Sequence, residues 1–194
     1  MNKLWRSLLV TLALTLSLTA NAATDIYGKL LSGTFMPSDS FASLSYDLTN
    51  AITNTYTFTL TAYDLDALFT PGAFIGAIAV DLSGPLPTIS NVSGGAPVSV
   101  SPGGGPTGIY DFRFDLTGPR MARLTANEFV TFDASFSGPV VLDKDSFALH
   151  VQGLTDAQGG SAWYIVPEPE TYALMLAGLG VMGFIARRRK AQMA

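Results

Sequence analysis

The stretch that decides the fold is residues 53–63, TNTYTFTLTAY. Its aromatic and aliphatic side chains occupy every second position and are separated by threonines: Tyr56, Phe58, Leu60 and Ala62 alternate with Thr55, Thr57, Thr59 and Thr61. A period of two is that of a β-strand with one face buried and the other in water. The stretch therefore predicts a strand that contributes large side chains to a core.

The same alternation recurs along the chain. It is clearest in residues 109–116, through Tyr110, Phe112, Phe114 and Leu116, and again through Val130, Phe132, Ala134 and Phe136. Shorter candidate strands are residues 25–31, 41–48, 74–82, 89–92, 98–100, 146–151 and 163–166. Gly- and Pro-rich turns separate them, and the run at 101–106 is interpreted as a flexible insertion. Without a helical period between residues 23 and 166, the pattern predicts an all-β domain, an antiparallel β-sandwich or a jelly-roll-like fold.

Charge and cysteine content exclude several classes of function. The chain of 194 residues has 11 Lys and Arg, 15 Asp and Glu, and no Cys. Residues 23–166 hold 5 basic and 13 acidic side chains, a net charge of −8. Nucleic-acid binding depends on Lys and Arg that neutralise phosphates, so we expect no nucleic-acid partner. Without Cys there is no disulfide, no Cys-ligated metal and no thiol catalysis.

The amino terminus has the three parts of a secretory signal peptide, which we place at residues 1–22. Lys3 and Arg6 precede an apolar run at 8–18, and Ala20-Asn21-Ala22 forms an A-x-A cleavage site. A transmembrane helix is the alternative, but the run is far shorter than the roughly 20 residues that a bilayer core requires. We therefore expect export across the inner membrane and a mature chain that starts at Ala23.

The carboxyl terminus combines an extended hinge, an apolar segment and a basic cluster. Pro167-Glu168-Pro169 precedes the apolar residues 172–186, which are followed by Arg187, Arg188, Arg189 and Lys190 and a short tail at 191–194. As a helix, residues 172–186 would be about 22 Å long, short of a bilayer core of about 30 Å. The basic cluster predicts a cytoplasmic end by the positive-inside rule. A plain tail anchor and a helix packed on the domain remain alternatives.

Three glycines in this segment, Gly178, Gly180 and Gly183, fit the G-x-G-x-x-G pattern of dinucleotide-binding sites. That pattern needs a preceding strand in a βαβ unit and a later acidic residue, and both are missing here. Small residues allow membrane helices to pack closely, so we interpret the glycines as a packing face.

Together, the Pro-Glu-Pro motif, the apolar helix and the terminal basic cluster resemble the PEP-CTERM sorting signal over residues 166–190. The resemblance implies a Gram-negative bacterium in which an exosortase cleaves near Pro167-Glu168-Pro169. It implies the exosortase and the inner membrane as partners, exopolysaccharide as a further candidate, and a final location at the cell surface or in the matrix. The protein is the substrate in this family, so the resemblance assigns it no catalytic residue or cofactor.

Chemistry within residues 23–165 is sparse. His150 is the only histidine, and its strand pattern predicts a solvent-facing position with Ala148 and Gln152. Acidic pairs occur at Asp64/Asp66, Asp111/Asp115 and Asp143/Asp145. Glycoside hydrolysis needs two carboxyl groups about 5–10 Å apart across a cleft, which this spacing does not indicate. A calcium site among them is left open and unassigned, and Trp163 and Tyr164 either stack on sugar or belong to the core.

These observations predict a noncatalytic structural or adhesive β domain of the cell envelope or biofilm matrix. We assign no catalytic residue, metal ligand or cofactor to it. A polysaccharide-binding module is the alternative from another class, and a plain tail-anchored envelope protein is a weaker one. A hydrolase of exopolysaccharide is a third class, for which no credible acid and base can be named.

Overall fold

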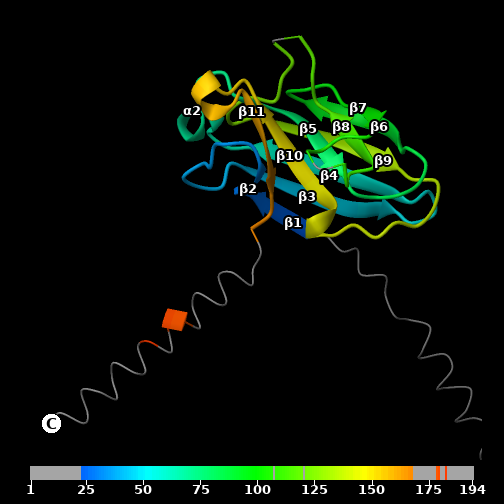
Figure 1. Cartoon of the computed structure of the whole chain (residues 1–194). Helices are drawn as coiled ribbons and strands as arrows, with labels where there is room; N and C mark the ends of the chain where they lie inside the picture. Colours follow the sequence, from blue (N-terminus) through cyan, green and yellow to red (C-terminus); the bar gives the residue numbers. More distant parts are fainter. Residues whose placement is uncertain (1–22, 107, 120, 168–177, 180–181, 183–194) are drawn as a thin grey trace, which may run out of the picture.

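The computed structural model describes residues 23–106, 108–119, 121–167, 178–179 and 182, and it shows two antiparallel β-sheets packed face to face (Figure 1). Sheet A has the order β1 (Ala23–Tyr27), β3 (Ala42–Asn50), β4 (Thr55–Ala62), β9 (Phe129–Ser135), β6 (Thr88–Gly94). Sheet B has the order β2 (Lys29–Ser32), β11 (Ser161–Ile165), β10 (Phe147–Gln152), β5 (Phe74–Val80), β8 (Phe112–Asp115), β7 (Ser99–Pro102). The prediction of an all-β sandwich is confirmed.

The core between the sheets is built from aromatic rings at the positions that the alternation predicted. Phe58 on β4 stacks on Phe132 on β9, with ring centroids 5.2 Å apart. Both rings meet Phe114 of sheet B, at 5.5 and 5.0 Å. Phe58, Leu60 and Ala62 are buried as expected, which fixes the threonines of β4 on the outer face.

One predicted strand is wrong in its extent. Residues 25–31 form two strands, β1 in sheet A and β2 in sheet B, that divide at Gly28. A Cβ at Gly28 would lie 3.3 Å from the Cα of Ser40, so the chain passes close to its neighbour where it changes sheets. Alternation alone does not reveal such a change, because both strands keep the period of two.

The Pro/Gly run at 101–106 is in part a strand, not only an insertion between strands. Ser101 and Pro102 belong to β7, and the Gly103 amide donates to the Asp111 carbonyl at 2.7 Å. Gly105, at φ +77°, packs closely on the ring of Tyr110, and a Cβ at this position would overlap with the ring atoms. The run is the packed end of the β7–β8 hairpin and lies over the outer face of sheet B.

Within the described part of residues 23–167, three short helical elements cap the strands: α2 (Leu65–Leu68), η1 (Lys144–Ser146) and η2 (Asp156–Gln158). A single turn is too short to give a helical period, so the sequence did not reveal them. The Gln158 side chain donates to the Phe69 carbonyl at 3.1 Å, which joins η2 to the end of α2 at one end of the sandwich (Figure 1).

Candidate functional site

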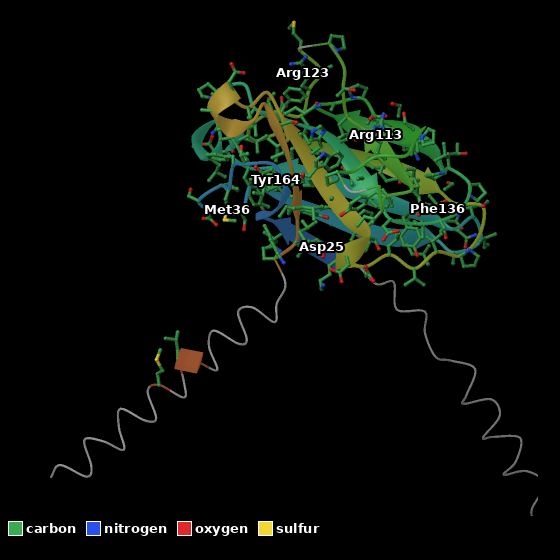
Figure 2. All side chains as sticks on the ribbon, viewed as in Figure 1. Asp25, Met36, Arg113, Arg123, Phe136 and Tyr164 are labelled. Atoms are coloured by element: carbon green, nitrogen blue, oxygen red, sulfur yellow. The ribbon has the colours of Figure 1, made fainter. Side chains whose placement is uncertain are left out.

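The sorting segment starts where β11 ends. Tyr164 on β11 is fully buried, and its hydroxyl donates to the Phe35 carbonyl at 2.8 Å (Figure 2). The Ile165 carbonyl accepts from the Gly28 amide at 3.5 Å. Pro167 is therefore two residues beyond a strand that has neighbours on both sides, β2 and β10.

Most predicted sorting and cleavage residues lie outside the described residues: Ala20, Ala22, Glu168, Pro169, Gly180, Gly183, Arg187, Arg188, Arg189 and Lys190. Gly178 is described as helical and exposed, with nothing within 4 Å of the position of a Cβ. Among the described residues, no helix is long and apolar enough to cross a membrane. The predicted helix at 172–186 falls largely on residues that are not described, so it stays a prediction.

Most side chains of the acidic pairs take part in hydrogen bonds or ion pairs that belong to the fold. Asp64 caps α2 by accepting from the Ala67 amide at 3.1 Å, and Asp66 accepts from the Gly72 amide at 2.8 Å. Asp115 pairs with Arg113 at 2.6 Å on the outer face of sheet B. Asp111, the other member of the Asp111/Asp115 pair, is exposed.

Of the third pair, Asp143 immediately precedes η1 and Asp145 lies within it. Asp143 caps it through a reciprocal pair of contacts with Ser146, and Asp145 pairs with Lys144 at 2.6 Å. Within the part of the chain that is described, no three His, Asp or Glu side chains are grouped so that they could hold a metal ion.

His150 was predicted to face water, and the structure corrects this. Its ring stacks on Trp163 of β11, with centroids 4.2 Å apart and planes at 2°. Ala148, on the same face, is fully buried, because Tyr110 from the β7–β8 hairpin covers it together with Ala79. Burial first and the nearby Arg113 guanidinium second lower the pKa of His150 to about 4.

A neutral His150 inside a stack is a poor general base near neutral pH, since its basicity has been lost to burial. Trp163 uses one ring face on His150, and Tyr164 belongs to the core. Of the two aromatic residues that the sequence suggested for sugar stacking, Tyr164 is thus buried, and Trp163 is partly exposed with one ring face against His150.

A buried polar group that the sequence analysis missed lies on β1. Asp25 shares the inward face with Tyr27 and is only 8% exposed; one of its carboxylate oxygens and the Tyr27 hydroxyl have no hydrogen-bond partner. Burial raises the pKa of Asp25, while a hydrogen bond with Tyr46 opposes the shift. Alternation with Tyr27 was the signal that could have placed Asp25 inside.

A shallow cleft of about 210 Å³ opens where two Ser-Gly-Pro turns face each other, Ser83-Gly84-Pro85 and Ser137-Gly138-Pro139. Its lining contains no titratable side chain; the other residues are Leu82, Phe136 and Val140. The cleft thus lacks the groups that acid–base chemistry requires.

An all-β domain that passes directly into a carboxyl-terminal Pro-Glu-Pro segment has the layout of a protein sorted by its carboxyl terminus. Residues 166–190 match the family model of the PEP-CTERM protein-sorting motif, so the chain carries this sorting motif after its β domain. The motif implies export, transient association with the membrane and processing by an exosortase. No curated protein and no solved structure matches the chain.

Proposed function

We propose that the protein is a noncatalytic structural or adhesive component of the cell envelope or biofilm matrix, released from the inner membrane by an exosortase. The match at residues 166–190 carries this proposal, because it begins immediately after β11 and makes the β domain the cargo of the sorting event. The mature product is then the sandwich itself with a few hinge residues.

The state of the polar side chains supports a noncatalytic cargo. Asp64, Asp66 and Asp143 accept hydrogen bonds from backbone amides, and Asp115 and Asp145 have cationic partners. A catalytic carboxylate needs a free face toward a substrate and a pKa suited to proton transfer. These carboxylates are instead committed to turns and ion pairs.

The test is the intact mass of the protein recovered from its native host, compared with the same host lacking the exosortase. We expect a mass that starts at Ala23 and ends near Pro167–Glu170 only in the parent strain, with the protein in the surface or matrix fraction. A mass that includes Arg187–Lys190 in both strains would show a permanent tail anchor and would overturn the proposal. Recovery of the processed protein only from the periplasm would contradict the surface location.

A further inference from the structure

The outer face of sheet A is an array of hydroxyl groups. Most outward side chains of its three central strands are Ser or Thr, and we call the following eight the hydroxyl face: Ser43, Ser45, Thr55, Thr57, Thr59, Thr61, Thr131 and Ser135. All eight are partly exposed, whereas the residues that alternate with them, such as Leu44, Phe58 and Phe132, are buried.

Strand register aligns the hydroxyl face in rows across the sheet. One row runs through Ser45, Thr59 and Thr131, with Thr24 on β1 and Ser93 on β6 at its ends. Neighbouring strands lie about 4.8 Å apart, so five strands give a face about 19 Å wide. That width is enough to accommodate several sugar rings.

The hydroxyls fix one another in place. Thr55 and Ser135 hydroxyls lie 2.7 Å apart, Thr59 and Thr131 hydroxyls lie 3.1 Å apart, and the Ser45 hydroxyl donates to the Thr59 carbonyl at 3.4 Å. A hydroxyl has one donor and two acceptor positions, so each pair keeps hydrogen-bonding capacity for a ligand. Short side chains already held in position lose little entropy when a ligand binds.

The charge on this face suits a neutral ligand. The five strands of sheet A contain no Lys, Arg or His. Asp47 and Asp133 are the outward carboxylates of β3 and β9, and Asp133 accepts from the Thr57 hydroxyl and the Asn91 amide, each at 2.6 Å. An anionic polymer would find no cation here and would be repelled by a domain of net charge −8.

An exposed aromatic ring lies at one end of the array. Phe129 on β9 is 53% exposed and is in register with Thr61. Tyr63 follows the last residue of β4 and is the next outward position after Thr61; its carbonyl accepts from the Asn127 amide at 2.9 Å. The flat apolar faces of sugar rings pack on aromatic rings while their hydroxyls need polar partners, and this end of the face offers both.

We propose that the hydroxyl face, with Phe129 at its end, binds a neutral polysaccharide that lies across the strands. The inference rests on the proposed adhesive function and names the class of ligand and the surface that holds it. Because no cationic contact is involved, binding is insensitive to salt, unlike attachment to an acidic polymer.

The test is retention of the full chain, in detergent micelles, on neutral polysaccharides (cellulose, dextran and galactomannan) and on anionic alginate. We expect retention on at least one neutral polymer, unchanged at high salt, and none on alginate. A double variant, Thr59→Val with Thr131→Val, removes two hydroxyls at constant shape and should weaken retention about tenfold. Phe129→Ala should weaken it to a similar extent.

The matched control is Ser99→Ala with Ser101→Ala on β7, which removes two hydroxyls from sheet B and should leave retention within about twofold. Equal unfolding free energies for all variants would show that the fold is intact. Failure of every neutral polymer to retain the protein, equal retention by the Thr59/Thr131 variant, or retention on alginate would overturn the proposal. Self-association abolished by the same variants would identify the face as an interface between copies instead. None of these results alters the mass of the processed protein in its host, so the two proposals fail separately.

Discussion

At the scale of single residues, His150 is expected to make stability depend on pH. Its pKa is about 4 in the folded protein and about 6.5 when unfolded, so the unfolded chain binds more protons between these values. The contribution of neutral His150 to the free energy of unfolding is fully present above pH 6.5 and is lost as the pH falls toward 4. With allowance for solvent screening, we expect a loss of about 1–2 kcal/mol.

Denaturant unfolding at pH 7 and at pH 4.5 measures this loss. His150→Phe keeps a ring against Trp163 but cannot titrate. The decrease in its unfolding free energy between pH 7 and pH 4.5 should therefore be about 1–2 kcal/mol smaller than that of the unsubstituted protein. An equal loss in the variant would show that other groups carry the pH dependence.

Two tyrosine hydroxyls in the core offer a matched pair of substitutions with opposite expected signs. The Tyr27 hydroxyl is buried without a partner, so Tyr27→Phe removes an uncompensated polar group and should raise the unfolding free energy by about 1 kcal/mol. Tyr46→Phe removes the hydrogen bond to Asp25 and should lower it by about 1–2 kcal/mol. Denaturation of both variants at one pH compares them directly; a loss of stability in Tyr27→Phe would show that its hydroxyl has a partner, such as a water.

At the scale of elements, the β7–β8 hairpin depends on Gly105. A Cβ there would enter the ring of Tyr110, the side chain that covers Ala79 and Ala148. Gly105→Ala should therefore cost about 2–3 kcal/mol, from a left-handed backbone and a displaced ring. Gly103→Ala is the control, because its φ of +67° is similar but nothing lies within 4 Å of the new atom; it should cost only about 1 kcal/mol. Equal losses of unfolding free energy in the two variants would mean that Gly105 does not pack closely on the Tyr110 ring.

The elements that the sequence predicted well are those with one dry and one wet face. β4, β8 and β9 alternate cleanly, and their inward residues are the ones expected. β5 is buried along its whole length, so burial there does not alternate. Tyr110 of the hairpin covers Ala79, the Gln152 side chain lies against Gly76, and Arg123 lies over Phe74. The division at Gly28 and the cover over Ala148 are tertiary events, and a local period carries no information about them.

At the scale of the whole molecule, the boundary between cargo and sorting segment can be tested by truncation. A chain that ends at Val166 keeps all of β11 and should retain its unfolding free energy within about 0.5 kcal/mol. A chain that ends at Gly160 lacks β11, which separates β2 from β10, and loses the buried Tyr164 ring; it should show no cooperative unfolding. Cooperative unfolding of the shorter chain would place the end of the domain before β11.

The sorting motif is the part of the candidate site that the sequence predicted, because its recognition depends on a linear order of residues. The hydroxyl face was less accessible to prediction. Alternation placed the threonines of β4 outside, but only the register of β3, β4 and β9 brings the serines and threonines into rows. Phe129 was missed because it precedes the alternating run that begins at Val130, although its parity already placed it outside.

The pairing of β2 with β11 has a consequence for the order of events during secretion. The Tyr164 hydroxyl reaches a carbonyl 129 residues earlier in the chain, so the first and last strands of sheet B are neighbours. A chain that enters the periplasm amino terminus first can pair β1 with β3 early, but β2 has no neighbour until β11 has emerged. Sheet B can therefore be completed only when β11 has been exported, and the sorting segment follows β11 directly. Folding of the β domain thus ends at about the time when the sorting segment reaches the membrane.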